Sequence, residues 1–120
     1  MPIQSYRELE VWKRSMDLVE GVHVLTKTFP ADERFGLVSQ IRRSAVSIPA
    51  NIAEGYGRSR RGDYLHHLSI ARGSLLEVET HLAISLRLGY TSSDQVDALW
   101  QTSQEVGKML RKMIDSLQVA

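Results

Sequence analysis

Arginines that could bind phosphate groups gather in one part of the sequence. Six of them lie between residues 34 and 61, and Glu54 is the only acid in that range. A planar guanidinium can donate two parallel hydrogen bonds to phosphate oxygens, so arginine is typical of nucleic-acid interfaces. Five of the six are our candidate contacts with RNA or DNA: Arg42, Arg43, Arg58, Arg60 and Arg61.

The same arginines have a structural interpretation, in which they are solvated charges or form ion pairs between subunits. The whole chain carries a net charge of only +1, which gives little support to a nucleic-acid partner. Arg58, Arg60 and Arg61 are the stronger candidates, because they lie between two expected helices and loops are normally exposed. The residues alone leave both interpretations open.

A lone carboxylate, Glu54, lies in a stretch rich in alanine and isoleucine. A buried charge without a partner is very costly, so we expect Glu54 to be paired. Arg72 on the following helix is the expected partner, with Asn51 and Glu77 adding hydrogen bonds. This arrangement predicts structural pairing rather than acid–base chemistry.

A metal-dependent enzyme is disfavoured by the spacing of histidines and glutamates. A di-iron helical bundle needs two Glu-x-x-His motifs and two further glutamates that face inward. Glu20 and His23 form one such motif, but Glu77 and His81 are four residues apart, and the last helix offers Glu105 without a histidine. No G-x-S-x-G motif is present. We therefore expect no catalytic residues, no metal and no cofactor.

The composition is that of one globular domain spanning residues 1–120. The chain is 42% hydrophobic and 24% charged and contains no cysteine, so disulfides and thiolate metal sites are excluded. No apolar run approaches the roughly 20 residues that a membrane-spanning helix requires. The first ten residues lack the layout of a signal peptide. We expect a cytoplasmic protein that does not bind membranes.

Helical periodicity predicts four long helices joined by short connections. The first should begin at a capping box formed by Ser5 and Glu8 and end near Thr28. The second should run from about Asp32 to the glycines of Gly55–Gly57, one of which could adopt a left-handed cap. The third should be capped by Ser59 and end at Leu88–Tyr90. The fourth should begin at a capping box of Ser92 and Gln95. The fold class is therefore all-α, an antiparallel up-down-up-down four-helix bundle.

Pro49 lies in the middle of the second expected helix. Proline removes a helical hydrogen bond and clashes with the carbonyl four residues earlier, here that of Ala45. Small residues surround it, so a neighbouring backbone can approach closely. We expect this helix to be kinked between Ala45 and Pro49.

The first expected helix carries two neighbouring apolar stripes, which is wider than packing within one bundle requires. An exposed apolar stripe usually marks an interaction surface. We therefore expect a homo-oligomer whose interface includes residues of this helix: Leu9, Val11, Trp12, Met16, Leu18, Val19, Val22 and Leu25.

Two long segments, LVSQIRRSAVSIPANIAEGYGR and YLHHLSIARGSLLEVETHL, closely resemble the bacterial 23S rRNA intervening-sequence protein family. Leu9–Trp12 and Phe29–Pro30 also match the family pattern. The resemblance implies a non-enzymatic four-helix bundle assembled as a ring-shaped homopentamer. A related branch of the family, the accessory proteins of diversity-generating retroelements, implies partners such as nucleic acid and a reverse transcriptase.

Two functional hypotheses follow. The first is a non-enzymatic oligomeric scaffold that binds RNA, DNA or a nucleic-acid-processing partner through its arginines. The second is a protein-interaction scaffold that binds no nucleic acid and uses these arginines in ion pairs between subunits.

Overall fold

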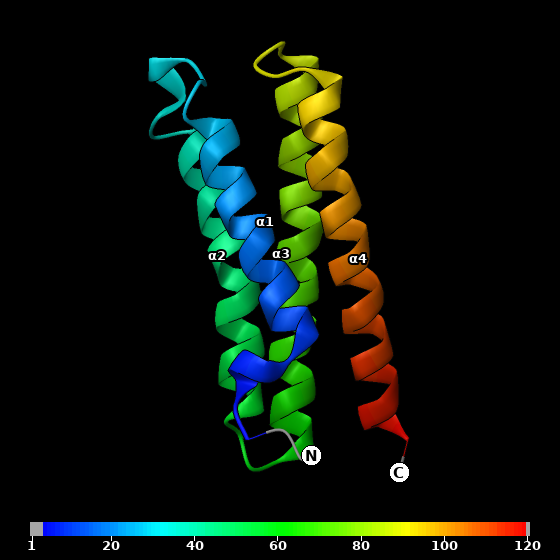
Figure 1. Cartoon of the computed structure of the whole chain (residues 1–120). Coiled ribbons are helices and arrows are strands. Elements are labelled where there is room, and N and C mark those ends of the chain that lie inside the picture. Colours follow the sequence, from blue (N-terminus) through cyan, green and yellow to red (C-terminus); the bar gives the residue numbers. More distant parts are fainter. Residues whose placement is uncertain (1–3, 120) are drawn as a thin grey trace.

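The computed structural model describes residues 4–119, and within them every regular element is a helix. Two short 3-10 helices, η1 (Tyr6–Glu8) and η2 (Ala31–Glu33), each precede a long helix. The four long helices are α1 (Glu10–Thr26), α2 (Leu37–Tyr56), α3 (Arg61–Arg87) and α4 (Ser93–Gln118). They alternate in direction along an elongated molecule, so that the start of α1 and the end of α4 lie at the same end (Figure 1). The predicted up-down-up-down bundle is confirmed.

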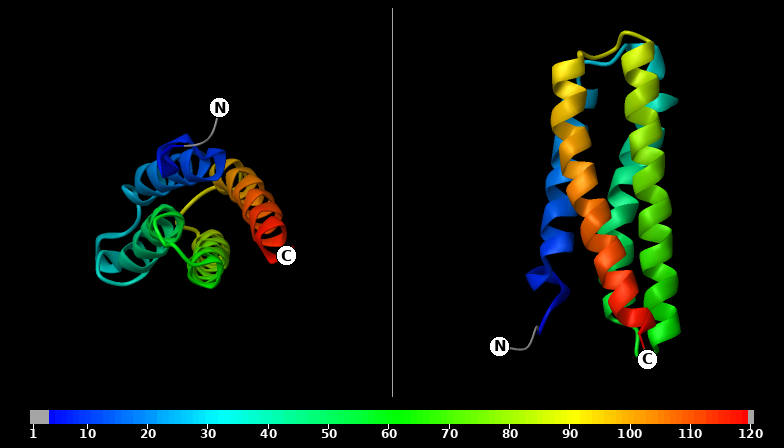
Figure 2. Two further views of the ribbon diagram at one scale, coloured as in Figure 1. Left: turned by 90° about the horizontal axis from the view of Figure 1, so that it is seen from below. Right: turned by 90° about the vertical axis from the view of Figure 1, so that its right-hand side faces the viewer.

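The helices form a closed ring in which each one packs against its two neighbours. α1 contacts α2 and α4, and α3 contacts the same two helices from the opposite corner (Figure 2). The contact between α2 and α3 is the most extensive of the four. α2 and α4 therefore occupy opposite corners of the bundle.

The core is formed by the apolar residues that the helical periodicity indicates. On α3, Leu68, Ala71, Val78 and Leu82 are completely buried, and Leu75 is nearly so. The other helices contribute leucine, isoleucine and valine side chains to the same core. Burying one such side chain stabilises the fold by roughly 1.5–3 kcal/mol, so this layer is the main source of stability.

The beginnings of α1 and α2 differ from the prediction. The Ser5 hydroxyl accepts the N–H of Arg7 at 3.1 Å, so this serine caps η1, and α1 begins only after Leu9. α2 begins at Leu37, because a carboxylate oxygen of Glu33 accepts the Leu37 N–H at 3.2 Å and takes the place of a capping serine. Each 3-10 turn uses polar residues that we had expected at the start of the long helix.

The connections at either end of α3 follow different rules. Ser59 does not cap α3, whose N-cap is Arg60 in an extended conformation, and Gly57 is right-handed with φ −77°. Both of these expectations were wrong. Gly89 has a φ of +76°, and the N–H of Tyr90 reaches the Ser85 carbonyl at 3.0 Å, which ends α3 in a Schellman motif.

The start of α4 agrees with the sequence prediction. Ser92 and Gln95 form the reciprocal capping box.

Pro49 lies inside α2 without breaking it, since the helix continues from Leu37 to Tyr56. Its ring is buried, and Ala45 one turn earlier is completely buried, so the small side chain leaves room at this point. The predicted kink at Pro49 stays a prediction.

Candidate nucleic-acid interface

An open depression at the start of α2 is lined by three arginines. It has a volume of about 510 Å³, and the arginines share it with one histidine, one serine and three apolar residues. No carboxylate lines it. None of the three arginines forms an ion pair with a residue between 4 and 119. The lining residues are His23, Arg34, Phe35, Val38, Ser39, Arg42, Arg43 and Val46.

Arg42 is anchored by a neutral partner. Its Nε–H donates to the hydroxyl of Thr26 at 2.8 Å, and that hydroxyl in turn donates to the Val22 carbonyl at 2.8 Å. Thr26 is the last residue of α1, where the helix dipole favours a positive charge. Arg42 is therefore held in place while its charge remains uncompensated by a carboxylate. Arg43, the next residue, is exposed.

Phe35 is the most exposed large apolar side chain of the described chain, with 87% of its surface accessible. The guanidinium carbon of Arg34 lies 5.3 Å from the centre of its ring. The sequence reasoning missed this residue, because it contributes to no helical stripe. A phenylalanine between an arginine and a glycine, outside any stripe, was the available signal.

The turn that carries Phe35 is tied to two other parts of the fold by Glu33. One carboxylate oxygen caps α2, as described above, and the other accepts the hydroxyl of Tyr90 at 2.8 Å. The Tyr90 ring packs on Phe29, with ring centres 5.5 Å apart. The hydrogen bond to Glu33 raises the pKa of Tyr90 above its usual value, because ionisation of the phenol would remove the proton that it donates. The Phe35 turn is thus fixed to the α3–α4 connection.

The second group of arginines lies at the opposite end of α2. Residues 43 and 58 are 15 positions apart, which corresponds to about 22 Å along a helix. Arg58 forms an ion pair with Glu54 at 2.9 Å. Arg60 and Arg61 are exposed and form no ion pair within the described residues. The structure therefore divides the five predicted arginines into two separate groups.

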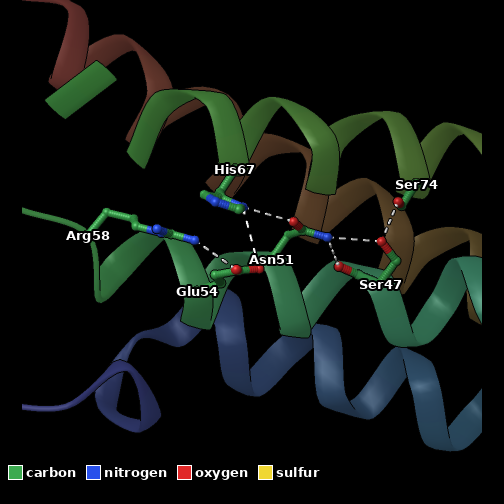
Figure 3. A network of polar contacts seen from close by, with 6 residues as sticks. All are labelled: Ser47, Asn51, Glu54, Arg58, His67 and Ser74. Atoms are coloured by element: carbon green, nitrogen blue, oxygen red, sulfur yellow. Dashed lines mark hydrogen bonds and ion pairs between the residues drawn. The ribbon is translucent and has the colours of Figure 1, made fainter. Parts of the chain in front are cut away.

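A chain of hydrogen bonds links α2 to α3 between these two ends (Figure 3). The Asn51 amide donates to the Ser47 carbonyl at 2.9 Å and to the Ser47 hydroxyl at 3.0 Å. The Asn51 oxygen faces Nδ1 of His67 at 3.1 Å, and the Ser74 hydroxyl donates to that of Ser47 at 2.9 Å. The helices that pack most extensively are thus also joined by polar groups.

The expected pairing of Glu54 with Arg72 is not formed. Glu54 is 53% exposed and is paired with Arg58, and its second oxygen lies 3.7 Å from Nδ1 of His67. Arg72 instead borders a depression between α3 and α4. Glu77 accepts a hydrogen bond from Ser44 at 3.3 Å. Glu54 projects into solvent from the last turn of α2, so it does not need the buried partner that we predicted.

Most of the residues expected at an oligomer interface on α1 are covered by the protein's own helices. Leu9, Val11, Leu18, Val22 and Leu25 are buried in the core. The three that retain exposure are Trp12 and Val19, which are half-buried, and Met16, which is 36% exposed. The wide apolar surface of α1 is used mainly within the bundle, because α1 packs against both α2 and α4.

Neither a metal site nor a membrane span is found in the part of the chain that the structure describes. No three of its histidine, aspartate and glutamate side chains are grouped so that they could hold a metal ion. His23, from the single Glu-x-x-His motif, has Nδ1 at 3.1 Å from the Val19 carbonyl. No helix in residues 4–119 is long and apolar enough to cross a membrane.

Comparison with known proteins agrees with this fold. The family model of the 23S rRNA-intervening sequence protein matches residues 7–112, and the chain belongs to this family. The fold is also similar to the crystal structure of a protein of unknown function from the S23 ribosomal protein family of Bacteroides thetaiotaomicron. That structure has a TM-score of 0.81 and 29% identity over 88% of this chain and 95% of the other. No curated protein matches.

Proposed function

We propose that this protein is a non-enzymatic, oligomeric scaffold that binds RNA or DNA through the arginine depression at the start of α2. The observation that carries the proposal is the set of three guanidinium groups, Arg34, Arg42 and Arg43, in a depression that no carboxylate lines. Membership of the 23S rRNA-intervening sequence protein family supports the same direction. Arg60 and Arg61 form a second candidate contact at the other end of α2.

Salt dependence is the property that distinguishes phosphate binding from other modes of binding. Each phosphate contact releases counterions, so the logarithm of affinity falls with the logarithm of salt concentration by about 0.9 per contact on duplex DNA and about 0.7 per contact on a single strand. Loss of two contacts flattens that slope by about 1.4 to 1.8. Between about 50 and 200 mM salt, the native protein should then lose roughly tenfold more affinity than a variant without the two contacts.

The test uses fluorescently labelled RNA and DNA oligonucleotides and the double variant Arg42→Ala/Arg43→Ala. A matched control, Lys108→Ala/Arg111→Ala, removes the same charge from α4 at the opposite corner of the bundle. We expect the α2 variant to bind more weakly and with a flatter salt dependence, and the α4 variant to bind like the native protein. Absence of binding at about 50 mM salt, or equal losses in both variants, would contradict the proposal.

The oligomeric part of the proposal is supported by the outer surface of α3. Ile70, Leu76, Ile84 and Leu86 on this helix are 39–55% exposed, although the helix also buries a complete stripe in the core. Apolar residues on two sides of one helix indicate a second packing partner. Light scattering at micromolar concentration measures the mass of the protein in solution, and a single species of monomer mass would contradict the proposed oligomer. A nucleic-acid-processing enzyme, such as a reverse transcriptase, is the further partner that we propose.

A further inference from the structure

We infer that Phe35 is a stacking platform for an unpaired base, so that the depression selects single-stranded nucleic acid over duplex. The inference rests on the proposed function and specifies the ligand of the same site. Phe35 is 87% exposed and lies within the same depression as the three arginines. A base that is paired in a duplex is already stacked on both sides, whereas an unpaired base can place its face on an aromatic ring.

The depression combines the two kinds of surface that a single strand requires. Val46, which is 48% exposed, contributes apolar surface to the same depression, and the buried side chain of Val38 forms part of its lining. Arg42 and Arg43 supply the positive charge that follows a phosphate backbone. The Arg34 guanidinium lies 5.3 Å from the centre of the Phe35 ring, and it can stack on a base as well as on the phenylalanine.

The platform is held before any ligand arrives. Glu33 bonds both to the first N–H of α2 and to Tyr90 at the far end of α3. A Cβ atom on Gly36, the residue after Phe35, would lie 2.8 Å from a carboxylate oxygen of Glu33, so this turn accommodates only glycine without displacing the tie. An anchored turn loses less backbone conformational entropy than a free loop when a base stacks on Phe35.

An exposed phenylalanine is also typical of contacts between proteins, and the experiment separates the two roles. The probes are a labelled single-stranded pyrimidine RNA and a duplex of the same length. Phe35→Ala should weaken binding of the single strand by about tenfold or more, and binding of the duplex by much less. Phe35→Trp should retain single-strand binding, because it keeps an aromatic face.

Phe35→Trp also places a fluorescent reporter at the site. Stacking of a base should quench this tryptophan on addition of the single strand. The native protein, with Trp12 and Trp100 only, gives the background to be subtracted. The double variant Arg42→Ala/Arg43→Ala should weaken binding of both probes, because both carry phosphates. This variant therefore measures the contribution of phosphate contacts separately from that of base stacking.

The outcomes distinguish this inference from the proposed function. If no nucleic acid binds at low salt, the proposed function fails and the inference fails with it. If nucleic acid binds but Phe35→Ala weakens both probes equally or neither, the inference alone is overturned. A change of oligomeric mass in Phe35→Ala, with binding per subunit unaltered, would assign Phe35 to a contact between copies and would also overturn it.

Discussion

Two glycines in the long helices should respond in opposite directions when they are changed to alanine. Gly55 lies near the end of α2 and is buried, whereas Gly73 lies in the middle of α3 and is exposed. Alanine is favoured over glycine inside a helix by about 1 kcal/mol, and this gain applies to both sites. The space around each glycine then decides the sign of the net effect.

At Gly55 the new methyl group would collide with α3. An ideal Cβ would lie 2.9 Å from Cβ of His67, and it would approach the side chain of Tyr64 to 3.0 Å and its carbonyl oxygen to 3.3 Å. A Cβ atom and a carbonyl move only with their backbone, so the two helices must separate. Overpacking of this kind costs typically 1–3 kcal/mol. Subtracting the helical gain from a middle value of about 2 kcal/mol leaves a net loss of about 1 kcal/mol.

At Gly73 nothing lies within 4 Å of the position that a Cβ would take. Gly73→Ala should therefore stabilise the fold by about 0.5–1 kcal/mol, which raises the Tm by a few degrees in a domain of this size. Thermal and urea unfolding followed by circular dichroism, at one fixed protein concentration, measures both variants. The reasoning is refuted if Gly55→Ala is as stable as the native protein, or if the two variants shift in the same direction.

Two further predictions concern polar contacts between helices. Asn51→Ala removes the bridge between Ser47 and His67, and the unfolding free energy should fall by about 1 kcal/mol because two partly buried partners lose a hydrogen bond. An unchanged urea midpoint would contradict this. Arg14 donates a hydrogen bond to Glu105 and lowers the pKa of that carboxyl. The stability that this ion pair contributes is fully present above the unfolded-state pKa of Glu105, and it is lost as the pH falls through the lowered folded-state pKa. Between neutral pH and about pH 3, the unfolding free energy of Glu105→Gln, measured in urea titrations, should therefore fall less than that of the native protein. An equal fall in the two proteins would contradict this.

The four helices and the residues that they bury could be predicted, because both follow from the helical spacing of apolar residues in the sequence. Residues spaced by three and four positions, such as Leu68, Ala71, Leu75, Val78 and Leu82, reach the core whatever the details of the connections. The capping box of Ser92 and Gln95 and the end of α3 near Gly89 agree with the sequence prediction. The equally local signals at Ser5 and Ser59 do not mark the starts of long helices, and Gly57, the C-cap of α2, is not left-handed. Helical periodicity involves only neighbours within a few residues, so the sequence contains the information that determines which face of each helix is buried.

Features that depend on distant residues could not be predicted in the same way. Glu33 replaces a capping serine at the start of α2, and its orientation is supported by Tyr90, which lies 57 residues away. The pairing of Glu54 was assigned to the wrong arginine, because the exposure of a residue beside an apolar stripe depends on the neighbouring helices. Phe35 was missed for a related reason, since an exposed aromatic residue outside a stripe leaves no periodic signal.

The near-neutral charge of the whole chain does not weaken the case for an anionic ligand at α2. Three carboxylates on α1 and α4 are paired with local cations: Glu10 with Lys13, and Asp17 and Glu105 with Arg14. α4 lies at the opposite corner of the bundle from α2 (Figure 2). The bundle measures 25 by 21 Å in cross-section. At physiological salt the Debye length is about 8 Å, so charges across the bundle are largely screened from the surface of α2. A phosphate that approaches the depression therefore responds to the nearby charges, which are its three arginines and the carboxylates of Asp32 and Glu33 in the adjoining turn, rather than to the net charge of +1.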